Sequence, residues 1–100
     1  MLNRLYLQQE LEKLVEHVYY NPPPNIQMNY PCIVYSKSKL STVKANDQIY
    51  KAWQAYNVTY ISKDSDSSIP YDILKHFPYA AYGNELRIDN LYQTTITIYI

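Results

Sequence analysis

Residues 56–100 read YNVTYISKDSDSSIPYDILKHFPYAAYGNELRIDNLYQTTITIYI, and most of the fold follows from this stretch. Apolar and polar residues alternate in three runs, with the period of two that is typical of half-buried strands. Ser68 is a candidate N-cap for a short helix between the first two runs, and Pro78 ends that helix. Asp89 and Asn90 indicate a turn between the last two runs. The predicted strands are residues 55–62, 79–88 and 92–100.

Upstream of this stretch, the sequence predicts one helix and one short strand. Apolar residues recur at helical spacing over residues 3–20, and Asn3 is a candidate N-cap. The prolines at 22–24 end this helix, because proline lacks the backbone donor. Residues 31–35, PCIVY, predict a buried strand. The polar residues 36–45 predict a long loop or a mobile hairpin tip.

The element order is therefore helix, strand, strand, helix, strand, strand. We expect a single α+β domain over residues 1–100. In it, an N-terminal helix and a short second helix pack on a mainly antiparallel sheet of about four strands. A chain of this length buries roughly 60–65% of its unfolded surface, which is enough for one modest core.

Composition argues against several classes of function. Nine Lys and Arg balance nine Asp and Glu, so no net positive charge attracts nucleic acid. Gly83 is the only glycine, which excludes the glycine-rich phosphate loops of nucleotide sites. Cys32 is the only cysteine, and its neighbours Ile33 and Val34 indicate a core thiol in a reducing compartment. Thirteen tyrosines suit half-buried sheets and protein interfaces.

Residues with catalytic or metal-binding chemistry do not form a recognisable set. A metal site needs several converging ligands, whereas His17 and His76 belong to different predicted helices. Residues 64–67, DSDS, lack the glycine and the closing glutamate of a calcium loop. Acidic residues interrupt the apolar N-terminal segment, so we expect neither a signal peptide nor a membrane span. We therefore expect a protein that is not an enzyme and holds no metal or cofactor.

Two features indicate a partner interface. The last predicted strand runs to residue 100, and a strand with an unpaired edge is either covered or used for pairing with a neighbour. Three lysines without an acidic residue occupy segment 36–45, where they either solubilise a loop or contact phosphate or an acidic protein surface. The candidate interface residues are Lys37, Lys39, Lys44, Tyr92, Thr94, Ile96, Ile98 and Ile100.

Four short motifs follow one another along the chain. They are P-[CY]-I-V-Y at residues 31–35, A-N-D-x-x-Y at 45–50, Y-x-V-x-Y-I-x-K-D at 56–64 and D-N-L-Y at 89–92. This succession resembles the small tail-terminator, or head-to-tail joining, proteins of long-tailed bacteriophages and prophages. The resemblance covers most of the chain after Pro31. The second motif departs from the family, which often has A-D-N there.

The resemblance implies an α+β subunit that forms a hexameric ring on the head-proximal end of the tail tube. Such a ring ends tube polymerisation and joins the tail to the head or neck. The implied partners are further copies of the chain, the tail tube protein and neck or connector proteins, with non-specific contact to DNA in the lumen and no membrane. The implied location is the virion tail or neck, after assembly in the host cytoplasm.

Two alternatives stay open at this point. One is a head-completion or connector-stopper protein of the neck, built from similar elements. The other is a small protein-binding module that adds its terminal strand to the sheet of a partner.

Overall fold

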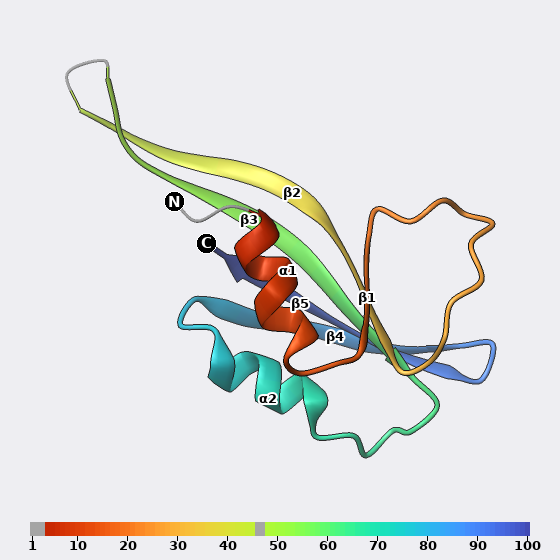
Figure 1. Cartoon of the computed structure of the whole chain (residues 1–100). Helices are drawn as coiled ribbons and strands as arrows, with labels where there is room; N and C mark the ends of the chain where they lie inside the picture. The colour runs from red at the N-terminus through yellow and green to blue at the C-terminus, as the bar shows by residue number, and fades with distance from the viewer. Residues whose placement is uncertain (1–3, 46–47) are drawn as a thin grey trace.

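The computed structural model describes residues 4–45 and 48–100, and for residues 40–45 and 48–53 it describes the backbone. Two helices cover one face of a five-stranded mixed sheet (Figure 1). The chain is therefore α+β, as the sequence predicted. The elements are α1 (Arg4–Glu12), β1 (His17–Tyr20), β2 (Cys32–Ala45), β3 (Gln48–Ser62), α2 (Ile69–His76), β4 (Ala80–Ile88) and β5 (Leu91–Tyr99).

The sheet order is β1-β2-β3-β5-β4, in which β1 runs parallel to β2 and all other pairs are antiparallel. The sequence predicted about four strands, whereas the sheet has five. Three strands, rather than two, precede α2. The last strand, β5, lies inside the sheet between β3 and β4. The described strands at the edges are therefore β1 and β4.

The first predicted helix is too long. α1 ends at Glu12, and residues 17–20 form β1, which pairs His17 with Cys32 and Tyr20 with Tyr35. The sequence HVYY is rich in aromatic and β-branched residues, which favour strands. Val18 also lies at helical spacing from Leu11, Leu14 and Val15, so the helical pattern continues into a segment that forms a strand.

The predicted loop at residues 36–45 is also wrong, because these residues continue β2. Strand β2 pairs with β3 from Cys32 opposite Ile61 as far as Ala45 opposite Gln48. A hairpin that extends beyond the core needs no apolar face, so the polar sequence is compatible with a strand. The alternative prediction of a hairpin tip at residues 36–45 is wrong for the same reason, and residues 46–47 lie outside the described residues.

A row of side-by-side residues crosses all five strands on the helix-covered face. The register places Tyr20, Tyr35, Val58, Ile96 and Tyr82 next to one another. The three central members of the row are no more than 1% exposed. Across the sheet, the core consists of Leu7, Leu11, Val15, Ile33, Tyr35, Tyr56, Val58, Tyr60, Ile73, Phe77, Ile96 and Ile98.

The C-terminal elements form as predicted. α2 begins after Ser68, but the predicted cap does not form, because the Ser68 hydroxyl accepts no hydrogen bond from a backbone N–H of the first turn. It donates instead to Asp72 Oδ2 at 3.4 Å. The turn at Asp89 and Asn90 has φ angles of 53° and 63°, the positive values that a two-residue hairpin turn requires. In β4, Gly83 sits at a register shift, where an added Cβ would stand 2.8 Å from the carbonyl oxygen of Thr95.

Candidate functional site

The terminal strand does not offer a free edge to a neighbour. β5 is paired with β3 on one side and with β4 on the other, so both edges are filled within the subunit. Among the candidate interface residues, Ile96 and Ile98 are 0% exposed and Thr94 is 5% exposed. Tyr92 and Ile100 are half-buried. The structure thus places Ile96 and Ile98 in the core, where a partner cannot contact them. Thr94 is buried beneath a cleft beside β4, and Tyr92 also lines that cleft.

The lysines lie on an extended strand instead of a loop. Lys37 and Lys39 are exposed on β2, whereas for Lys44 only the backbone is described. Lys37 is opposite Tyr56, which in turn is opposite Ile98. The lysines and the terminal strand therefore belong to the same sheet. They do not form the single partner interface that the sequence predicted, because Ile98 is buried while the lysines are exposed.

The hairpin of β2 and β3 extends beyond the rest of the sheet, and we call residues 38–45 and 48–53 the arm. β1 makes its last backbone bond to β2 from Asn21 N to Tyr35 O, at 3.1 Å. On the other side, the last bonds join Gln54 to Ile100, at 3.1 and 3.2 Å. Figure 1 shows the arm projecting away from both helices, and the longest dimension of the molecule is 51 Å.

The arm begins at a β-bulge. The register shifts between Lys37 and Leu40, and the Gln54 side chain donates to the carbonyl oxygen of Lys39 at 3.1 Å. A bulge increases the local twist and bends the strands, which directs the arm away from the sheet. Past this point, the two strands of the arm have only each other as partners among the described elements. An isolated two-stranded hairpin is marginally stable in water, so the arm is suited to contact with another surface.

A second open surface lies at the opposite edge of the sheet. All residues of β4 after Ala80 are exposed, and its outer edge has no strand partner in the described chain. Five of the six most exposed large apolar side chains among the described residues lie on or beside this strand. We call them the β4 surface: Tyr71, Tyr79, Tyr82, Leu86 and Ile88. Exposed apolar residues on an open edge strand are typical of an interaction site.

The sequence did not single out the β4 surface. Its signal is the composition of residues 80–88, AAYGNELRI, in which apolar residues occur on both faces and a glycine interrupts the strand. Alternation predicts only one buried face, so the prediction of a strand was correct while the exposure of its apolar residues was not foreseen.

A cleft of about 300 Å³ opens between α2, β4 and the turn that precedes α2. The register shift at Gly83 places both Tyr82 and Glu85 on the helix-covered face, opposite Ile96 and Thr94. Both residues line the cleft together with Asp64 and Ser67. We call it the tyrosine cleft after Tyr60, Tyr71, Tyr82 and Tyr92 in its walls. Its aromatic walls and acidic rim suit a segment that carries apolar and basic groups.

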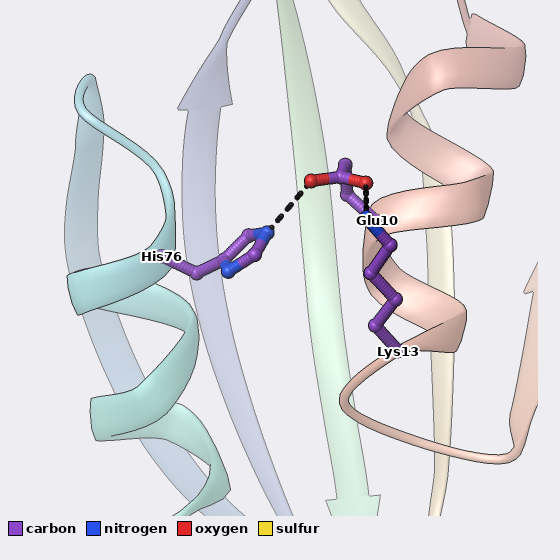
Figure 2. Close-up of polar contacts among 3 residues, drawn as sticks. All are labelled: Glu10, Lys13 and His76. Carbon is purple, nitrogen blue, oxygen red and sulfur yellow. Dashed lines mark hydrogen bonds and ion pairs between the residues drawn. The ribbon is translucent and has the colours of Figure 1, made fainter.

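A polar network joins the two helices above the sheet (Figure 2). His76 Nε2 on α2 lies 3.0 Å from Glu10 Oε1 on α1, and the other carboxylate oxygen of Glu10 lies 2.6 Å from Lys13 Nζ. The Glu10 side chain is only 14% exposed. The hydrogen bond from Lys13, followed by the one from His76, lowers the pKa of Glu10 below its ordinary value, and the pKa of Lys13 is raised by the same contact.

This network gives an expected dependence of stability on pH. Because the folded-state pKa of Glu10 is lowered, its contribution is present above the ordinary value of 4.5 and is lost as the pH falls through the folded-state value. Glu10→Gln should therefore flatten the acid limb, and unfolding of the variant should take up fewer protons, by up to about one. Urea unfolding between pH 3 and 6 measures this. Glu12→Gln, on the exposed side of the same helix, is the control. Equal acid limbs for wild type and Glu10→Gln would contradict the expectation.

The remaining chemical groups are structural in character. Cys32 is buried, as predicted, and burial raises the pKa of its thiol to about 11. A thiol with that pKa is protonated at neutral pH and is a poor nucleophile. The Asp64 carboxylate accepts a hydrogen bond from Asp66 N at 2.9 Å, which closes a turn. Residues 4–45 and 48–100 contain no group of three or more His, Cys, Asp or Glu side chains arranged to hold a metal ion.

In the described part of the chain, no helix has the length and apolar character needed to span a membrane. The chain matches neither a model of a known protein family nor a curated protein. The two open surfaces, the arm and the β4 surface with its cleft, are therefore the features from which a function is to be argued.

Proposed function

We propose that this protein is a structural subunit of the tail of a long-tailed bacteriophage or prophage. In this role it forms a hexameric ring at the head-proximal end of the tail tube, ends tube polymerisation and joins the tail to the head or neck. It works as an assembly part rather than as an enzyme, and it needs no cofactor. Its place is the virion tail or neck, after assembly in the host cytoplasm.

The observation that carries this proposal is the arm. Its strands leave backbone N–H and C=O groups unpaired on their outer sides, and such groups favour pairing with another chain. The arm lies beyond the last backbone bonds that join the hairpin to β1 and β5, at Tyr35 and Gln54. A long hairpin that extends past the five-stranded part of the sheet is well suited to holding neighbouring subunits together.

The β4 surface supports assembly into a ring. It lies at the opposite edge of the sheet from the outer side of β2, so the two open surfaces differ and face away from each other. Contacts between two different surfaces repeat from subunit to subunit and either close into a ring or continue as a filament. The resemblance along residues 31–92 supplies the phage context and the partners: the tube protein, neck proteins and the DNA that passes through the lumen.

The experiment that tests the proposal measures assembly. Light scattering after size exclusion should give a ring mass, and electron microscopy should place rings at one end of purified tail tubes. Tubes polymerised with the protein present should be shorter. A protein that stays monomeric at every concentration and leaves tube length unchanged would refute the proposal.

Two other functions remain as alternatives. A connector-stopper would bind the portal side of the neck, so imaging on particles separates it from a tube-end ring. A small binding module would act by strand addition, which the open edge of β4 favours. Such a module would bind one partner at fixed stoichiometry and form no ring.

A further inference from the structure

We propose that the contact between subunits is head to tail: the arm of one copy lies along the open edge of β4 and over the tyrosine cleft of the next copy. The proposal rests on the proposed function in one respect, which is that the chain assembles with itself. Its partner is defined as the arm of a second identical chain, so each subunit donates one arm and receives another.

The two free edges fit this arrangement in direction and length. The outer side of β2 is unpaired beyond Tyr35, and the outer side of β4 is unpaired along the whole strand. These sides face opposite ways in the sheet, so placing one against the other continues the sheet into the next subunit. The arm supplies eight residues of β2, 38–45, and β4 has nine, 80–88. The free side of β3 in the arm faces the same way as β4 and would not extend the sheet in this manner.

The charges of the two surfaces are complementary. Residues 37–53 contain four lysines and one aspartate, whereas residues 64–72 contain three aspartates. Asp72 is paired with Lys75 at 3.8 Å within the subunit, and Lys63 directly precedes Asp64. Asp64 and Asp66 are therefore the acidic residues offered to a partner. Lys37 and Lys39 are exposed, and so are Asp64 and Asp66. The chain has no net charge, so these opposite charges are separated within it rather than in excess. Complementary patches of this kind steer association and select the partner.

The charges cannot neutralise each other inside one subunit. Figure 1 places the arm and the turn before α2 at opposite ends of the molecule. The basic base of the arm therefore meets the acidic rim of the cleft only in another copy. The cleft also offers the aromatic rings of Tyr71 and Tyr82, which are 63% and 53% exposed.

Charge reversal tests this contact. Lys37→Glu with Lys39→Glu should weaken assembly about tenfold or more at low salt, and Asp64→Lys with Asp66→Lys should do the same. All four changes in one chain should restore the ring, because each subunit then carries both reversed surfaces. An equal mixture of the two double variants should also assemble, with the two kinds of subunit alternating. Sedimentation velocity at 50 and 500 mM salt measures each case.

A matched control for the aspartate pair makes the same charge change elsewhere. Glu12→Lys with Glu16→Lys alters exposed residues outside the described arm and cleft and should leave assembly unchanged. Circular dichroism melting confirms that each variant is folded. If a reversal variant does not fold, Ser38→Cys with Ser65→Cys replaces it. A bismaleimide should then join neighbouring subunits, and neither single cysteine variant should be joined.

The outcomes separate this inference from the proposed function. Two results would refute this contact and leave the proposed ring intact, provided that the wild type forms rings. In the first, both double variants assemble as tightly as the wild type. In the second, neither the fourfold variant nor the mixture of double variants recovers assembly. Absence of the cysteine cross-link within intact rings overturns this contact as well. If the wild type never assembles and never binds tubes, the proposed function itself fails.

Discussion

Replacing Ile96 with aspartate should unfold the subunit. Ile96 is 0% exposed and lies between Val58 and Tyr82 in the row that crosses the sheet. Loss of a buried isoleucine side chain costs about 2–5 kcal/mol. Burial of a carboxylate without a partner costs several kcal/mol more. A domain of this kind is stable by about 5–15 kcal/mol, so the change removes most or all of that free energy. Far-UV circular dichroism and thermal melting should show a chain without a cooperative transition.

The next residue along the strand provides the matched control. Thr97 is half-buried on the opposite face of β5, because successive side chains of a strand alternate between faces. Thr97→Asp should fold cooperatively, with a melting temperature lowered by about 10 °C at most. Ile98→Asp should behave like Ile96→Asp, since Ile98 is also 0% exposed. If Ile96→Asp melts cooperatively at the temperature of Thr97→Asp, the position of β5 in the core is wrong.

Removing the arm should abolish assembly and leave the subunit folded. Leu40 and Gln54 are opposite each other in the register, so an Asn-Gly turn in place of residues 41–53 closes a short hairpin. The deleted residues lie beyond the last backbone bonds that join the hairpin to β1 and β5, and the melting temperature should therefore stay within about 5 °C of wild type. Light scattering should report a monomer at concentrations at which the full chain forms rings. Tail tubes should no longer be terminated by the variant.

A milder variant tests how much the lysines contribute to the effect of the arm on assembly. Changing Lys37, Lys39 and Lys44 to serine keeps the arm at full length and should weaken joining without unfolding the subunit. Assembly of the shortened chain into normal rings would contradict the role of the arm. Loss of solubility in the triple variant would instead indicate that these lysines act mainly as a solvated surface.

Local sequence patterns were sufficient for the α+β class, for α2 and for the β4–β5 hairpin. In these segments the signals agree: Ser68 and Pro78 bound α2, and Asp89 and Asn90 take the positive φ angles of a tight turn. The alternation of residues 92–100 also places Ile96 and Ile98 on one face of β5, although the sequence assigned them to a partner interface and the structure buries them in the core. Each of these features depends on neighbours within about ten residues, so the local sequence is sufficient to predict it.

The edges of the sheet depend on contacts between distant segments, and no local pattern contains them. Residues 17–20 have spacing that fits a helix or a strand, and their pairing with residues 32–35 makes them β1. Residues 36–45 are polar enough for a loop, yet pairing with β3 holds them extended. Likewise, alternation marks β5 as a strand without saying that β3 fills its second edge. The sequence therefore predicted a free edge at the terminal strand, whereas the structure has its free edges at the arm and at β4. The reason is that the order of strands in a sheet is set by tertiary packing rather than by the pattern within each strand.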